Sequence, residues 1–155
     1  MGGIHEQAVV MKLAIAREFA KQEFDVFVTL DFVNALKGAK NTRENCDEIL
    51  SSFHRSLSKA CCVSRMVWRR NKPQIKMAGS VELSKNARLH SHLLMKRPSH
   101  LNHGEFEAEV KKIATGNPWI LNGRFAVDYK KINLSDDDRL RGYVTKDISQ
   151  VIWRA

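Results

Sequence analysis

The stretches KMAGSVEL (76–83), SKNA (84–87) and RLHSHLLMK (88–96) decide the fold of this chain. Two largely apolar stretches flank a short polar segment, and this pattern predicts two β-strands joined by a turn as an antiparallel hairpin. Side chains two residues apart in a strand point to the same face of the sheet. His90 and His92 are therefore expected to project toward a common point, which makes a two-nitrogen site for a metal ion.

A carboxylate is expected to join the two histidines. With the turn centred near Asn86, Glu82 lies roughly opposite His90 and faces the same side of the hairpin. Two imidazoles and one carboxylate bind a divalent cation and leave positions open for water or a substrate oxygen. Mixed nitrogen and oxygen ligation suits Mn²⁺ or Mg²⁺ paired with a phosphate, and the sequence leaves Zn²⁺ open. The alternative is a pair of ordinary surface or core histidines, because His-x-His pairs also arise by chance.

Outward from this hairpin, the sequence predicts helices and strands without strict βαβ alternation. The longest predicted helix is capped by Thr42 and runs to about Ala60, with an apolar stripe that includes Ile49 and Phe53. The other predicted elements are helices over Gln7–Gln22, Gly104–Thr115 and Ser135–Ile148, and strands over Phe24–Phe32, Ser64–Trp68 and Phe125–Tyr129. This order predicts an α+β fold, in which a central antiparallel β-sheet of about five strands is flanked by helices.

The net charge of +9 is concentrated in one part of the chain. Residues 54–98 contain eleven Lys or Arg against one acid, Glu82, which is a net charge of +10. A concentrated basic block indicates a polyanionic partner, with nucleic acid as the first candidate. An anionic membrane surface fits less well, because no strongly amphipathic basic helix is evident there. A merely solvated basic face is the remaining alternative.

The cysteines and the N-terminal residues are typical of a cytoplasmic protein. Cys46, Cys61 and Cys62 form no Cys-x-x-Cys pair, so they indicate buried or half-buried thiols rather than a zinc site or a disulfide framework. No apolar run is long enough to cross a bilayer, and no signal-peptide pattern is present near Lys12. The 155 residues are expected to form a single domain.

A second chemical motif is Tyr143-Val144-Thr145-Lys146 in the last predicted helix. Residues three apart share a helix face, so Tyr143 and Lys146 point together. A tyrosine hydroxyl has a pKa near ~10 and is a poor nucleophile unless it is assisted. A neighbouring ammonium group favours the phenolate or holds a phosphate. Taken alone, this spacing more often marks an interfacial tyrosine beside a solvated lysine.

Three motifs in order resemble those of the HUH endonucleases, and specifically of the rolling-circle replication initiator (Rep) proteins. They are FVTLDF at 27–32, His-Ser-His at 90–92 and Tyr-x-x-Lys at 143–146, and the resemblance covers about residues 24–150. Asp31 stands where the family has a second threonine, and Ser91 stands where it has a hydrophobic residue. A single tyrosine in the helix motif makes relatives with paired catalytic tyrosines a poorer match.

The resemblance implies a ferredoxin-like HUH fold and a metal-dependent nickase that initiates rolling-circle replication at a single-stranded DNA origin. Glu82, His90 and His92 would hold Mn²⁺ or Mg²⁺, and Asp147 is a further candidate ligand. Tyr143 would attack the scissile phosphate to give a 5′-phosphotyrosine, and Lys146 would steady the phosphate or the phenolate. No P-loop occurs in the sequence, so no fused helicase is expected and the host would supply helicase and polymerase.

The basic block supplies the candidate DNA-binding residues. They are Arg69, Arg70, Lys72, Lys76, Lys96 and Arg97, with Trp68 as a residue that could stack a base or belong to the core. Three alternatives stay open: an HUH transposase or mobilisation relaxase, a non-catalytic DNA-binding module of the same fold, and a metal-dependent hydrolase that uses water. The sequence does not define the oligomeric state.

Overall fold

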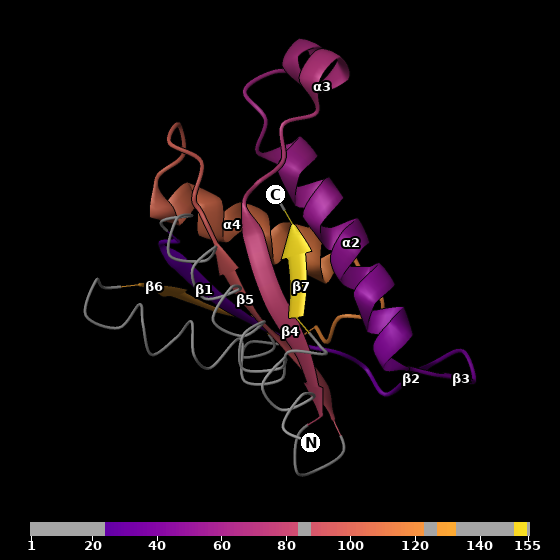
Figure 1. Cartoon of the computed structure of the whole chain (residues 1–155). Helices are drawn as coiled ribbons and strands as arrows, with labels where there is room; N and C mark the ends of the chain where they lie inside the picture. Colours follow the sequence, from indigo (N-terminus) through magenta and orange to yellow (C-terminus); the bar gives the residue numbers. More distant parts are fainter. Residues whose placement is uncertain (1–23, 84–87, 123–126, 133–150, 155) are drawn as a thin grey trace, which may run out of the picture.

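The computed structural model describes residues 24–83, 88–122, 127–132 and 151–154, and it confirms the α+β prediction. A five-stranded antiparallel sheet has the order β6-β1-β5-β4-β7 (Figure 1). The strands are β1 (Val26–Asp31), β4 (Met77–Leu83), β5 (Leu89–Met95), β6 (Val127–Lys131) and β7 (Val151–Arg154). The predicted hairpin is the β4–β5 pair at the centre of this sheet, and β1 lies on the other side of β5.

Two helices cover one face of the sheet and form the core with it. They are α2 (Arg43–Ala60) and α4 (His103–Thr115). Thr42 caps α2 as predicted, since its hydroxyl accepts a hydrogen bond from the Asn45 backbone N–H at 3.1 Å. The apolar stripe of α2 is buried against alternate residues of the strands, including Leu30 and Leu93. No helix in the described ranges is long and apolar enough to cross a membrane.

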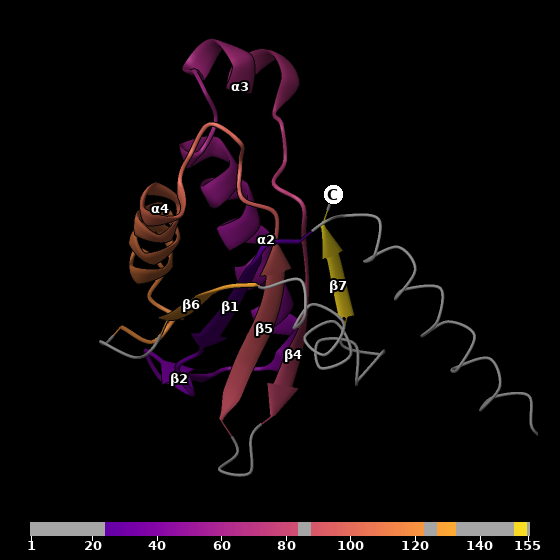
Figure 2. The same ribbon diagram turned by 90° about the vertical axis from the view of Figure 1, so that its left-hand side faces the viewer.

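The segment predicted as a strand over Ser64–Trp68 is instead a helix, α3 (Arg65–Asn71). The Ser64 hydroxyl accepts a hydrogen bond from the Val67 backbone N–H at 3.1 Å, which caps a helix rather than extending a strand. Lys72 ends it in the left-handed conformation, with φ of 42°. Figures 1 and 2 show α3 beyond the end of α2, away from the sheet.

The remaining elements are short or were not predicted. Strands β2 (Ala35–Leu36) and β3 (Ala39–Lys40) form a short hairpin around Gly38, and neither strand was predicted. The edge strand β7 was also not predicted. The predicted helices over 7–22 and 135–148, the turn at 84–87 and the start of the strand predicted at 125–129 lie outside the described residues.

Candidate metal centre

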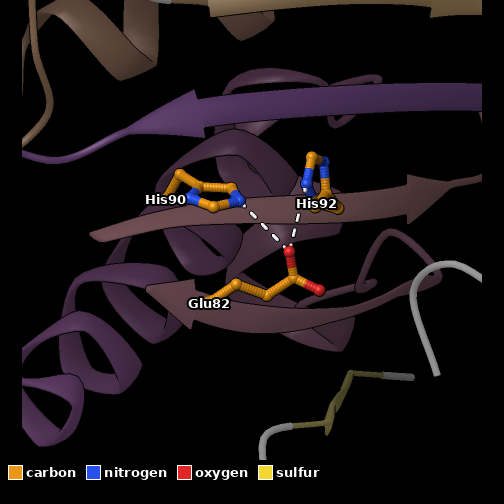
Figure 3. A group of neighbouring side chains, drawn as sticks. All are labelled: Glu82, His90 and His92. Carbon is orange, nitrogen blue, oxygen red and sulfur yellow. Dashed lines mark hydrogen bonds and ion pairs between the residues drawn. The ribbon is translucent and has the colours of Figure 1, made fainter. Parts of the chain in front are cut away.

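Adjacent antiparallel strands bring Glu82, His90 and His92 together. Glu82 of β4 pairs with His90 of β5 in the strand register, which confirms their predicted opposition. His92 lies two residues along β5 and points to the same face, opposite the face that packs on α2 and α4. Figure 3 shows the carboxylate of Glu82 directed between the two imidazole rings. The three ligand atoms lie within 4.8 Å of one another.

The distances fit a single divalent cation. The Oε2 atom of Glu82 is 3.1 Å from His90 Nε2 and 3.4 Å from His92 Nε2. Two ligands about 2.1 Å from one ion, at tetrahedral or octahedral angles, lie roughly 3.0–3.4 Å apart. The same atoms are also close enough for hydrogen bonds between a carboxylate and protonated imidazoles. The distances therefore fit either a bound metal ion or hydrogen bonds from imidazole N–H groups to the carboxylate.

Burial of the carboxylate favours a cation at this site. Glu82 is 7% exposed and His92 is 8% exposed. A carboxylate removed from water to this extent is costly unless a cation or several donors stabilise it. His90 is the more accessible ligand, with 16% of its side chain exposed. The more accessible side of the cluster is thus at His90, where water or a substrate oxygen would approach.

The neighbouring strand β1 fixes the orientation of His92. Thr29 pairs with His92 in the register, and its Oγ1 lies 3.1 Å from His92 Nδ1. The ring of Phe27 stacks on the His92 ring at 5.5 Å with an interplanar angle of 14°. If Nδ1–H donates to Thr29, the Nε2 atom directed at Glu82 carries the lone pair, which is the arrangement of a metal-binding histidine. Sequence reasoning missed this role of Thr29 and Phe27, although their alternate spacing in β1 placed them on one face.

Two further polar residues share this face. Ser80 pairs with His92 across the β4–β5 ladder and is completely buried. In the described part of the chain its hydroxyl has no hydrogen-bond partner. Asp31 pairs with His90 across the β1–β5 ladder and lies on the same face as Thr29. Oxygen-bearing side chains therefore flank the histidines on both neighbouring strands.

Ser91, one of the two residues that depart from the motifs that the sequence resembles, points to the opposite face. It is completely buried, and its hydroxyl donates to the backbone carbonyl of Ser80 at 2.9 Å. That hydrogen bond makes a polar residue acceptable on the helix-covered side of the sheet. Replacement of the usual hydrophobic residue therefore leaves the directions of His90 and His92 unchanged.

The candidate DNA-binding residues lie around α3 and at the far end of the hairpin. Arg69, Arg70, Lys72 and Lys76 are exposed, whereas Trp68, Lys96 and Arg97 are partly buried. Arg97 also has structural partners: its Nη1 donates to the carbonyl of Leu101, and its Nε lies 3.5 Å from Asp25 Oδ2. Their contact with DNA stays a prediction. Tyr143, Lys146 and Asp147 lie outside the described residues, so their position relative to the histidines also stays a prediction.

Comparison with known proteins gives one remote similarity. No protein family and no curated protein matches the chain. Among solved structures, the N-terminal nuclease domain of the non-structural protein 1 of Minute virus of mice is similar, with a TM-score of 0.31 and 10% sequence identity. The match covers 93% of this chain and 72% of that one. That domain is described with Zn²⁺ coordinated in its active-site pocket and with DNA recognition at the origin of replication. A similarity this low carries no conclusion about the present chain.

Proposed function

We propose that this chain is a divalent-metal-dependent HUH-type endonuclease that nicks and rejoins single-stranded DNA. One observation carries the proposal: Glu82, His90 and His92 gather three ligand atoms within 4.8 Å on one face of an antiparallel sheet. The neighbouring strand supports it, because the motif over 27–32 lies beside the histidine strand and contributes Thr29 to His92. The basic block supports an anionic substrate.

Each site residue would have a separate role in the proposed reaction. Glu82, His90 and His92 would hold Mn²⁺ or Mg²⁺, which when bound polarises the scissile phosphate and neutralises its charge. The phenolic oxygen of Tyr143 forms a bond to phosphorus, and the bond from phosphorus to the 3′ oxygen of the preceding nucleotide breaks. That oxygen takes a proton and leaves as a 3′-hydroxyl. Lys146 steadies the phosphate or the phenolate, and attack by a 3′-hydroxyl on the phosphotyrosine rejoins the strand.

The biological role proposed for this reaction is the initiation of rolling-circle replication. The free 3′-hydroxyl primes synthesis, while the 5′ end stays attached to the protein. The partners would be single-stranded DNA at a replication origin and a helicase and polymerase of the host. Asp147 would add a ligand to the metal, and the reaction would take place in the cytoplasm or wherever the replicon resides.

The test is formation of a covalent adduct between the protein and labelled single-stranded DNA. A pool of oligonucleotides with randomised sequence avoids the need to know the origin, and Mn²⁺, Mg²⁺ and Zn²⁺ are compared. We expect an adduct on a denaturing gel that is lost with chelator, with His92→Ala and with Tyr143→Phe. Tyr129→Phe is the matched control, because Tyr129 lies outside the motif and contacts His103 at 2.8 Å.

Each negative result of this test would exclude a different part of the proposal. Equal adduct formation by Tyr143→Phe would exclude that residue as the nucleophile. Cleavage without any covalent species would identify a hydrolase that uses water. Absence of both cleavage and metal binding would leave a DNA-binding module. The sequences enriched among cleaved oligonucleotides distinguish a replication origin from a transposon end or a transfer origin.

A further inference from the structure

A cavity of about 490 Å³ opens between α3, the end of α2 and the far end of the β4–β5 hairpin. Its apolar wall includes Val63, Val67, Pro73 and Ile75. Lys76 and Lys96 also line it, at the strand ends opposite the hairpin turn. The cavity is therefore an apolar hollow bordered by cations, and it lies outside the cluster formed by Glu82, His90 and His92.

A second hollow of about 710 Å³ adjoins the first, since Cys62 lines both. Lys59, Arg65 and Arg69 line it together with Trp68. Figure 2 shows α3 projecting beyond the sheet at this end of the molecule, so both hollows lie beside an element that packs little against the core. No residue of α3 is buried.

The charged side chains that line these hollows are all basic. Residues 59–81 contain six Lys or Arg and no Asp or Glu. A large apolar side chain is exposed among them, since Val63 is 65% exposed and lines the first cavity. Apolar or aromatic surface interleaved with cations is the composition that binds single-stranded nucleic acid, because bases pack on the apolar groups while phosphates contact the cations.

The distance from the cavity to the metal centre equals the length of a few nucleotides of one continuous strand. Lys96 follows His92 by four residues along β5, and Lys76 precedes Glu82 by six residues along β4. At about 3.3 Å per residue these separations are roughly 13–20 Å. A stacked strand with ~3.4 Å per nucleotide would span this distance with about four to six nucleotides. One strand could thus reach from the cavity to His90.

We propose that the cavity lined by Val63, Val67, Pro73 and Ile75 receives an unstacked base of single-stranded DNA, whose flanking phosphates contact Lys76 and Lys96. This inference rests on the proposed function, and it adds a recognition site several nucleotides from the cleaved phosphate. The site selects unpaired DNA, because a base held in a duplex stack cannot enter an apolar hollow.

The test compares two glutamate substitutions in the same helix. Val67 lines the cavity, whereas Met66 lines neither hollow. Binding of fluorescent oligo(dT) of 12 nucleotides to the full chain is measured by anisotropy in EDTA, so that the metal centre does not contribute. We expect Val67→Glu to weaken binding at least tenfold, and Met66→Glu to weaken it no more than threefold through its charge alone. Thermal unfolding of both variants verifies that they are folded.

An abasic oligonucleotide of the same length separates base docking from phosphate binding. The unsubstituted protein should bind it about tenfold more weakly than oligo(dT), and Val67→Glu should show no such difference. Equal effects of the two substitutions, or equal binding of both oligonucleotides by the unsubstituted protein, would overturn the base-binding site while leaving the nickase proposal standing. No binding of single-stranded DNA at all would overturn both. A dimer in sedimentation that Val67→Glu dissociates would assign the cavity to a second copy instead.

Discussion

At the scale of single residues, the orientation of His92 depends on Thr29. The hydroxyl of Thr29 lies 3.1 Å from Nδ1 of His92, and the opposite ring nitrogen is directed at Glu82. Groups that hold a metal-binding histidine in this way set its tautomer and its direction. Thr29 is thus a positioning residue that does not contact the proposed ion.

We predict that Thr29→Val weakens metal binding without abolishing it. Loss of such a hydrogen bond lowers metal affinity by about 10- to 100-fold. Calorimetric titration with Mn²⁺ and Zn²⁺ measures the change, and Thr115→Val is the control because its hydroxyl only bonds a carbonyl within α4. Unchanged affinity in Thr29→Val would show that the hydrogen bond to His92 does not position a ligand.

The fold also alters the titration of His103. Burial lowers the pKa of His103, with a smaller contribution from Arg97. The neutral ring lies 2.8 Å from the hydroxyl of Tyr129. Burial also raises the pKa of Tyr129, so that its phenol stays protonated at neutral pH. The pair is therefore a neutral hydrogen bond between α4 and β6.

We predict a loss of stability on acidification that His103→Gln reduces. The folded protein holds His103 neutral, so the unfolded chain takes up the proton first as the pH falls below about 6.5. The contribution of this residue is complete above that pH and is lost as the pH falls through the lowered pKa. Melting temperatures at pH 7.5 and 5.0 in EDTA measure the effect, and an equal decrease in both proteins would contradict it.

At the scale of secondary-structure elements, the close contact between β4 and β5 depends on Gly79. A Cβ atom at this position would lie 2.5 Å from the backbone oxygen of His92 and would also clash with Leu93. A backbone oxygen cannot move away without separating the two strands. The same strands hold Glu82 and His92, so the packing of Gly79 and the metal geometry are coupled.

We predict that Gly79→Ala destabilises the protein and weakens metal binding. Overpacking of this kind costs about 1–3 kcal/mol. Gly116→Ala is the matched control, because its Cβ would make only ordinary contacts at 3.5 Å. Urea unfolding and the metal-induced rise in melting temperature are measured for both. A stable Gly79→Ala protein with unchanged metal response would show that the strands shift to accommodate the methyl group.

Elements with a strong local pattern were predictable from sequence, and elements defined by distant partners were not. Helix α2 has a cap and a five-residue apolar stripe, and the alternating pattern of β4 and β5 puts Glu82 and His90 on one face within eight residues of each other. Helix α3 has only seven residues, too few for a helical period to stand out in an apolar run. The Thr29–His92 contact joins residues 63 positions apart, and no local pattern encodes such a register.

At the scale of the whole molecule, the position of the basic residues is more informative about a nucleic-acid partner than the net charge. The net charge is +9, whereas residues 54–98 alone carry +10. The fold places this segment in the end of α2, in α3 and in the central hairpin, so that the basic residues and the metal centre occupy neighbouring elements. Under the proposed function, a strand of nucleic acid attracted to α3 would reach the face that carries His90.

We predict that the salt dependence of single-stranded DNA binding depends on where charge is removed. Each phosphate contact contributes about 0.7 to the slope of log K against log salt for single strands, so removal of three contacts lowers the slope by roughly 2. The triple substitution of Arg69, Arg70 and Lys72 by alanine should produce this decrease. Substitution of Lys111, Lys112 and Lys130 removes the same net charge from α4 and β6 and should leave the slope nearly unchanged. Equal slopes for the two triple variants would mean that DNA binding depends on the net charge alone. In that case α3 would not be the DNA-binding surface.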